Sequence, residues 1–329
     1  MHPPAFWFTP PDRPALRARL LAPLGAVYAR LTALRVARAP EYVAPVPVIC
    51  VGNLNLGGTG KTPTVIALVQ MLQAMGYKPH ILSRGYGGSL VGPVQVDARE
   101  HDSGQIGDEP LLMAAFAPVW VGRARAQAAR AAVAAGAEIL IMDDGFQNPA
   151  LAKDLSVLVI DAAIGFGNAR VFPAGPLREP VVTGLERADL AITIGSTDMQ
   201  RRFERVHCLG LLERFEAELR PLQMGMSWKG LRVLAFAGIG RPEKFFATLR
   251  AEGAEILRAE ALSDHQPLTD ALMARLELEA KALGAQLVTT EKDAVRLPAK
   301  FRAKVLALPV RLKIAEPSLL ESRLRSALR

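Results

Sequence analysis

The sequence predicts an α/β fold: a mostly parallel sheet covered by helices, a second smaller α/β domain, and a helical arm at the N-terminus. Two observations predict it. Short apolar runs alternate with helical segments over most of the chain, and most of the runs are near-continuous, as in a sheet covered on both faces. A second strand–helix series begins after residue 222. We expect an arm at 1–45, a main domain at 46–222 and a smaller domain at 223–329.

A glycine-rich run follows the first predicted strand, Val46 to Val51. Leu56-Gly-Gly-Thr-Gly-Lys-Thr62 turns from this strand into a helix running from Pro63 to about Met75. Glycines let backbone N–H groups close around phosphate oxygens, a lysine reaches the terminal phosphates, and a threonine hydroxyl holds Mg²⁺. A turn without a ligand is the alternative, but strand, Gly-Lys-Thr and helix are all in register. The run therefore predicts a P-loop nucleotide site made of Asn55, Gly57, Gly58, Thr59, Gly60, Lys61 and Thr62.

The strict P-loop pattern has glycine where this chain has Asn55. Asn is the non-glycine residue most tolerant of a left-handed backbone, so we expect the departure to be mild. The other half of a nucleotide site follows Glu138, where four apolar residues end in Asp143 and Asp144. A carboxylate in this position reaches Mg²⁺ directly or through water.

Composition limits the partners. The formal charge of +8 and the pI near 9.8 favour an anionic partner: nucleic acid, an acidic membrane surface or a phosphorylated substrate.

Two distant cysteines, Cys50 and Cys208, argue against a disulfide framework and for the cell interior. We expect no signal peptide and no membrane crossing, because no uncharged run reaches the roughly 18 residues that a spanning helix needs.

The arm contains a predicted helix at 13–39 with one apolar stripe at steps of three and four residues. The stripe is Leu16, Leu20, Leu24, Val27, Leu31 and Leu34, and arginines flank it on both sides. Pro23 is expected to break or kink the helix. The stripe either lies in a membrane interface, with arginines reaching lipid phosphates, or packs into the body of the protein.

Three loops carry further candidates. Arg84-Gly-Tyr-Gly-Gly88 leaves the second predicted strand, where it either grips a phosphate and a sugar or is a solvated turn. Gly107-Asp-Glu-Pro110 opens a short helix, so its acids either favour the helix dipole or supply a carboxylate base. His265 lies in a loop of the second domain, and spacing alone favours no chemical role for it.

Three function classes remain: a P-loop kinase, an ATPase or GTPase switch that delivers something, and a nucleic-acid enzyme. Partitioning and metal-delivery ATPases carry lysine where this chain has Leu56, and no Asn-Lys-x-Asp guanine reader is present. Only 6% of residues are aromatic, and no run interleaves them with basic residues as nucleic-acid modules do. A kinase is therefore favoured, with the switch ATPase as the alternative.

Together the motifs resemble one family, the tetraacyldisaccharide 4′-kinase of lipid A and lipopolysaccharide synthesis. The matching segments are Val51-Gly-Asn-Leu54, Gly57-Gly-Thr-Gly-Lys-Thr-Pro63, Ser83-Arg-Gly-Tyr-Gly87, Gly107-Asp-Glu-Pro110, Asp143-Asp-Gly-Phe-Gln147, Pro173-Ala-Gly-Pro-Leu-Arg-Glu179, Asp264-His265 and Thr290-Glu-Lys-Asp-Ala294. They are spread over most of the chain in the family's order. The resemblance implies ATP and Mg²⁺ as cofactors and transfer of the γ-phosphate to the 4′-hydroxyl of a tetraacyldisaccharide 1-phosphate.

The resemblance also implies roles for residues. Asp108 is expected to be the base, helped by His265, with Lys61 on the phosphates. The acids expected at the metal and nucleotide are Asp143, Asp144, Glu109 and Glu179, beside Thr62. The residues expected to line the sugar and its phosphate are Arg84, Gly85, Tyr86, Arg125, Gln147 and Arg178.

The resemblance implies a monotopic enzyme on the cytoplasmic face of a bacterial inner membrane. Its partners would be a phosphorylated acyl-disaccharide lipid and the membrane surface, with no nucleic acid and no obligate protein partner. A lipid substrate must be met at the interface, so the resemblance favours membrane contact for the arm.

Overall fold

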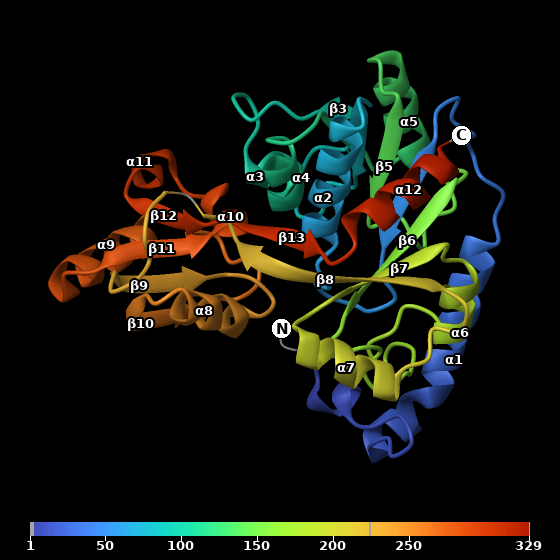
Figure 1. Cartoon of the computed structure of the whole chain (residues 1–329), viewed down its shortest axis with the longest axis horizontal. Coiled ribbons are helices and arrows are strands. Elements are labelled where there is room, and N and C mark those ends of the chain that lie inside the picture. Colours follow the sequence, from blue (N-terminus) through green and yellow to red (C-terminus); the bar gives the residue numbers. More distant parts are fainter. Residues whose placement is uncertain (1–2, 224, 329) are drawn as a thin grey trace.

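The computed structural model describes residues 3–223 and 225–328, and it folds into two sheets (Figure 1). The first sheet is built around strand β1, whose β-branched residues are all buried. In spatial order its strands are β13 (Val310–Ile314), β8 (Glu213–Pro221), β7 (Leu190–Ile194), β6 (Leu155–Asp161), β1 (Val48–Gly52), β5 (Ile139–Asp143), β2 (Pro79–Ser83), β4 (Val119–Val121) and β3 (Val94–Gln95). The strands from β8 to β4 are parallel, and the two edge strands are antiparallel to their neighbours.

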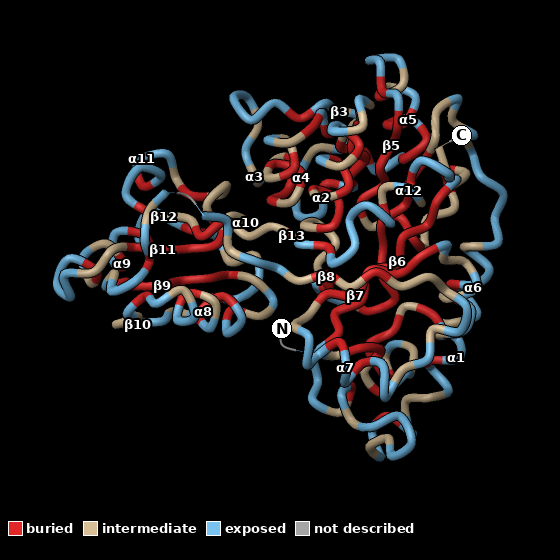
Figure 2. Tube along the Cα trace, viewed as in Figure 1, coloured by how far each residue is buried: buried red, intermediate tan, exposed pale blue. Residues whose placement is uncertain are grey.

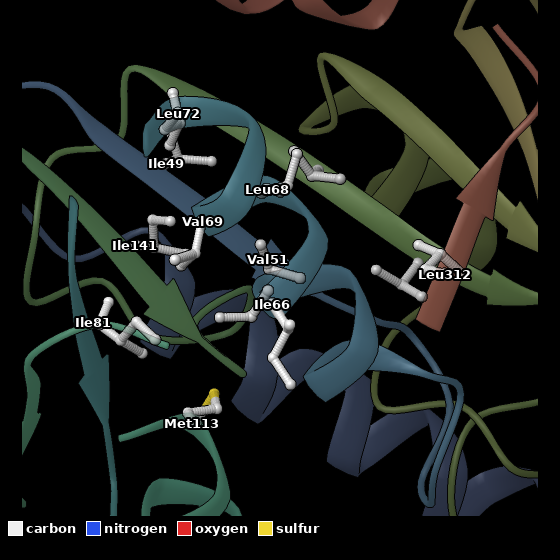
Figure 3. Packing of buried hydrophobic residues seen from close by; sticks show 14 of the residues in the cluster. Ile49, Val51, Ile66, Leu68, Val69, Leu72, Ile81, Met113, Ile141 and Leu312 are labelled. Atoms are coloured by element: carbon white, nitrogen blue, oxygen red, sulfur yellow. The ribbon is translucent and has the colours of Figure 1, made fainter. Parts of the chain in front are cut away.

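Helices cover both faces of this sheet. They are α2 (Lys61–Ala74), α3 (Ser103–Ile106), α4 (Asp108–Met113), α5 (Arg125–Ala134), α6 (Val181–Glu186), α7 (Thr197–Val206) and α12 (Pro317–Ala327). Alternate residues of β1 point to opposite faces: Ile49 and Val51 join one core with α2, α4 and α12, and Val48 and Cys50 join another with α5 and α7. Figure 3 shows how the apolar side of α2 packs on the first of these cores.

The second sheet has the strand order β10 (Glu255–Ala261), β9 (Arg232–Ala237), β11 (Gln286–Thr290), β12 (Val305–Leu308), and all pairs are parallel. Its helices are α8 (Pro242–Ala251), α9 (Asp270–Leu283), α10 (Glu291–Ala294) and α11 (Ala299–Arg302). Separate cores form on its two faces, one under α9 and one under α8. The predicted α/β class with a smaller second α/β unit is confirmed.

The chain end departs from the expected layout. Residues 310–329 were expected in the smaller domain, but β13 pairs with β8 in the first sheet, and Leu320 and Leu324 of α12 are fully buried in the first core. Figure 1 shows this red segment crossing from the small sheet to the large one. These apolar side chains fill the end of the first core, which explains why the chain returns from the second sheet to the first.

The arm is a 3₁₀ turn, η1 (Ala5–Phe8), followed by α1 (Leu16–Val36), which continues through Pro23 without breaking. The helix docks through its small face: Ala18, Gly25 and Thr32 are buried. The apolar stripe points the other way, and its six side chains, Leu16 to Leu34, are 58–71% exposed. Figure 2 colours the exposed residues of α1 pale blue. The alternative in which the stripe enters the core is therefore wrong.

Candidate active site

The candidate residues gather where the carboxyl ends of the parallel strands meet. The P-loop follows β1, the Arg84 loop follows β2, and Asp143 ends β5. In the second sheet, His265 follows β10 and α10 follows β11, again at carboxyl ends. Ligands of open α/β sheets bind at this edge. The two edges face each other, because His265 of one contacts Asp108 of the other.

The P-loop has the shape that phosphate binding needs. Gly60, with φ of +97°, caps the start of α2, and a Cβ there would lie 2.5 Å from Ile194 Cδ1. Lys61 Nζ lies 3.3 Å from Asn53 Oδ1 and 3.6 Å from Asp144 Oδ1. The backbone N–H groups at the start of α2 have no partner within the helix and favour an anion.

Asn55 fits the P-loop for a reason other than the expected tolerance of a left-handed backbone. It is not among the described non-glycine residues with positive φ, which are Asp144, Ala169 and His265. Its side-chain amide instead donates to the Gly165 carbonyl at 3.0 Å, and its backbone pairs with Leu177. The residue therefore anchors the start of the P-loop to the neighbouring loop.

The two carboxylates after β5 differ in their electrostatics. Burial, then the negative charges of Glu109 and Asp144, raise the pKa of Asp143 to about 7. Burial alone would also raise the pKa of Asp144, but the Lys61 and Arg178 cations hold it below its ordinary value. Asp144 is therefore the firmly ionised member of the pair, whereas ionised Asp143 is disfavoured by its burial and its acidic neighbours.

A chain of hydrogen bonds supports Asp144. Arg178 donates to both Asp144 oxygens at 2.9 and 3.2 Å and to Gln147 Oε1 at 3.2 Å. Gln147 Nε2 donates to Glu179 Oε1 at 2.9 Å, and Arg187 holds both Glu179 oxygens at 2.6 Å. The Glu179 carboxylate is thus paired with the Arg187 cation, and the Arg178 guanidinium is bound to Asp144 and Gln147.

Arg125 is buried, not surface-lining. It is 3% exposed and donates to the Gly122 and Asp143 carbonyls at 3.2 and 3.1 Å. Burial lowers the pKa of Arg125 to about 10, so it stays a cation at neutral pH. Ser83 adds a hydrogen bond to Asp143 Oδ2 at 3.3 Å. Both side chains fix the end of β5.

The loop of Arg84, Gly85 and Tyr86 has a buried glycine between two exposed side chains. Arg84 is exposed, and Tyr86 is 75% exposed with its ring 6.1 Å from that of His265. Gly107, with φ of +89°, lets this loop approach closely, since a Cβ there would lie 2.5 Å from the Tyr86 carbonyl oxygen. The loop is therefore held beside Asp108.

Asp108 and His265, 157 residues apart, meet across the two sheets. His265 Nδ1 lies 2.9 Å from Asp108 Oδ2, and Asp108 is 9% exposed. Glu109 makes a second bridge, with Lys292 Nζ at 3.1 Å from its Oε1. The arrangement offers a carboxylate that is oriented by an imidazole.

The donors fit Mg²⁺ bound mainly through a nucleotide. Over 3–223 and 225–328, no three or more His, Cys, Asp or Glu side chains form a metal cluster of their own. Within the same ranges, the buried oxygens Thr59 Oγ1 and Asp143 Oδ1 have no hydrogen-bond partner. Unpaired buried oxygens are costly and mark a place for a ligand. Mg²⁺ commonly takes one or two carboxylates and completes its shell with phosphates and water.

Sequence reasoning assigned no role to Asn53, Arg187, Asp161 or Lys292, which the structure places in or beside the site. Asn53 and Lys292 lie inside the quoted motifs, which is the signal that could have found them. Arg187 and Asp161 carry no such signal.

A parallel sheet with a P-loop after its central strand, carboxylates on the adjacent strand and a carboxylate–imidazole pair facing them defines a P-loop kinase. The family model described as tetraacyldisaccharide-1-P 4′-kinase matches residues 17–329, and the chain belongs to this family.

Similar proteins agree. The tetraacyldisaccharide 4′-kinase of Dinoroseobacter shibae is 59% identical over 326 residues, covering 98% of this chain and 97% of the relative. That of Jannaschia sp. is 55% identical over 323 residues, covering 98% of each. The crystal structure of the "apo" form of LpxK from Aquifex aeolicus in complex with ATP has a TM-score of 0.77 and 26% identity, covering 96% of this chain and all of that one.

Proposed function

We propose that this chain transfers the γ-phosphate of ATP to the 4′-hydroxyl of a tetraacyldisaccharide 1-phosphate, a step of lipid A synthesis. The observation that supports this best is the 2.9 Å contact between Asp108 Oδ2 and His265 Nδ1, because a carboxylate oriented by an imidazole is suited to accept the proton of a hydroxyl. A switch ATPase has no acceptor hydroxyl to deprotonate. The names of the relatives support the same substrate.

Each residue then has a task. Asp108 takes the proton of the sugar hydroxyl as its oxygen bonds to the γ-phosphorus and the bond to the β–γ bridging oxygen breaks, leaving ADP. His265 orients Asp108. Lys61 neutralises the transferred phosphoryl group, and the P-loop glycines and Thr59 hold the phosphates. When bound, Mg²⁺ supplies further neutralising charge on the phosphates, and Thr62, Asp143 and Asp144 would hold it.

We propose a smaller set of substrate contacts than the one expected. We assign Arg84 and Tyr86 to the sugar and its 1-phosphate because their side chains are exposed, and buried Gly85 shapes the loop between them. Arg178 and Gln147 support Asp144, and Arg125 fixes the Asp143 backbone. Glu109 and Glu179, each paired with a cation, act as supporting acids near the metal and nucleotide.

We further propose that α1 rests on the cytoplasmic face of the inner membrane. Its six exposed apolar side chains form one stripe, and the arginines beside them are exposed as well. No helix in the described part of the chain is both long and apolar enough to span a bilayer. Co-flotation with anionic vesicles tests this proposal.

The domain division is proposed with one change. Residues 1–45 form the arm, 46–222 together with 310–328 form the kinase domain, and 223–309 form the smaller domain. Limited proteolysis tests it: a cut is expected at the exposed residues Leu222, Gln223 and Gly225. Release of the C-terminal segment with the small domain would contradict the assignment of β13.

The decisive experiment incubates the protein with ATP, Mg²⁺ and the disaccharide 1-phosphate and reads product mass for one added phosphate. Asp108→Asn is expected to lower the rate by about 10²–10⁴-fold, the contribution typical of a general base, while ATP still binds. Asp102→Asn on the neighbouring helix keeps its N-cap and is the control, with wild-type rate expected. Phosphate release without acceptor at the full rate would instead support a switch ATPase, and loss of ATP binding in Asp108→Asn would place that residue in the nucleotide site.

A further inference from the structure

The turn that follows β5 has a backbone conformation that needs support. Asp144 has φ of +52°, in the left-handed region that residues with a Cβ seldom adopt. Such a conformation persists where the surrounding contacts hold it. Two residues further on, Phe146 is 1% exposed and lies against Gly52, where an added Cβ would overlap with the Cβ of Phe146. The turn that carries Asp144 is therefore packed, through Phe146, against the end of β1.

Arg187, to which the proposed function gives no task, holds this turn through Phe146. It directly follows α6, and its Nη1 donates to the Phe146 carbonyl at 3.0 Å. Its Cζ lies 4.5 Å from the centroid of the Phe146 ring, which is a cation–π contact. Lys153 Nζ donates to the same carbonyl at 3.1 Å, so two cations hold the backbone of the turn.

Arg187 also ends the chain of side chains that supports the Asp144 carboxylate. Its Nη2 donates to both Glu179 oxygens at 2.6 Å, and the Glu179 side chain is 4% exposed. Glu179 accepts from Gln147 Nε2 at 2.9 Å. Gln147 in turn accepts from Arg178, which donates to both Asp144 oxygens. A guanidinium carries five donors in a fixed fork, so one side chain can serve the backbone route and the side-chain route together.

We propose that Arg187 is a positioning residue for the metal–nucleotide site: it holds the turn of Asp144 so that this carboxylate is directed toward Mg²⁺. The inference rests on the proposed function, which gives Asp144 the task of holding the metal. Groups that contact a ligating carboxylate from behind fix its direction, and their loss typically lowers metal affinity about 10- to 100-fold. The two routes to Asp144 meet in Arg187, whereas the Lys153 contact belongs to the backbone route alone.

The test measures metal affinity in the full-length protein in detergent, with ADP present and no acceptor. Mn²⁺ is titrated into the protein with equimolar ADP, and into ADP alone for subtraction, and electron paramagnetic resonance reads free Mn²⁺. Arg187→Met is expected to weaken Mn²⁺ binding about 10- to 100-fold. Affinity for methylanthraniloyl-ADP in EDTA, read from its fluorescence, should change less than about twofold, because the backbone N–H groups of the P-loop are untouched. A merely structural role would lower both affinities together.

Arg187→Lys is the second variant, and it keeps a cation beside the buried Glu179 carboxylate in case Arg187→Met does not fold. An ammonium group is a point charge that cannot serve the Phe146 carbonyl and both Glu179 oxygens together. We therefore expect Mn²⁺ affinity about 3- to 10-fold below that of the wild type.

Arg214 provides the matched control, because it also pairs with two glutamates, Glu204 and Glu216, and lies 6.0 Å from the centroid of the Phe203 ring. Arg214→Met should leave Mn²⁺ affinity unchanged. Wild-type Mn²⁺ affinity in folded Arg187→Met or in Arg187→Lys, an equal loss in Arg214→Met, or a parallel loss of ADP affinity in EDTA would overturn the proposal. Mn²⁺ binding needs no acceptor, so its failure stays distinct from absence of kinase activity, which the wild-type assay reports.

Discussion

Asp143 is a single residue whose ionised form is costly in the folded chain. Its Oδ1 is buried without a hydrogen-bond partner among the described residues, and its pKa is raised from 3.8 to about 7 by burial, Glu109 and Asp144. Between these two pH values the folded chain retains a proton that the unfolded chain has lost. The free energy of unfolding therefore falls as pH rises through this window.

Asp143→Asn is expected to be more stable than the wild type at pH 8, because the amide carries no charge to bury. Three pKa units correspond to about 4 kcal/mol, so we expect a gain of about 2–4 kcal/mol at pH 8 that shrinks toward pH 4. Urea unfolding without nucleotide or Mg²⁺ at both pH values measures it. Asp189→Asn, at a carboxylate that accepts Ser156 N, is the matched control and should show no such gain. A variant no more stable at pH 8 than at pH 4, relative to wild type, contradicts the cost assigned to Asp143.

At the scale of elements, the apolar strands and the periodicity of α1 were predictable from the sequence. Which elements lie next to one another in space was not predictable. Strand β8 was missed because charged residues occupy most of Glu213–Pro221 and only Phe215 and Ala217 are buried in its core. The docking face of α1 could not be predicted from an apolar stripe. The helix docks through Gly25 instead, where a Cβ would lie 2.8 Å from the Val171 carbonyl oxygen.

That docking makes deletion of the arm a poor test of membrane contact. The loop under Gly25 continues to Pro176, whose carbonyl accepts from Leu56 N of the P-loop at 2.7 Å. Removing α1 would uncover this loop and disturb nucleotide binding as well. Substitutions on the outer stripe leave the docking face intact.

We therefore expect Leu20→Gln, Leu24→Gln and Leu31→Gln together to weaken vesicle binding more than tenfold. Burying each leucine contributes about 1.5–3 kcal/mol, and Gln retains helix propensity. Co-flotation with anionic vesicles measures binding, and kcat on detergent-dispersed substrate should stay unchanged. The same change at three other exposed leucines, Leu211, Leu278 and Leu319, is the control. Equal flotation of the triple variant and the wild type would return α1 to a packing role.

At the scale of the whole molecule, the proposed base and its partner come from the two different sheets, and the sequence allowed this to be anticipated only in part. The Asp108–His265 pair was expected from a family resemblance, since spacing along the chain gives no reason to join them. A further contact between the sheets was not expected. Asp161, at the end of β6, is 5% exposed and accepts from Arg241 Nη1 and Lys244 Nζ of the small domain, each at 2.9 Å.

Asp161→Asn is expected to loosen closure without touching the P-loop. It leaves two cations without a counter-charge, and removing one partner of a buried pair costs about 3–5 kcal/mol. Arg241 and Lys244 side chains are 36% and 50% exposed and regain water, so we expect about 1–3 kcal/mol. His265 then contacts Asp108 in a smaller fraction of the molecules. Because 1 kcal/mol corresponds to a factor of about five, kcat should fall at least about fivefold, while KM for ATP stays unchanged. Faster hydrogen exchange in α8 would report the opening directly.

Glu277→Gln breaks ion pairs inside the small domain only and should leave kcat unchanged. Wild-type kcat in Asp161→Asn, or an equal loss in Glu277→Gln, would show that closure does not depend on this contact.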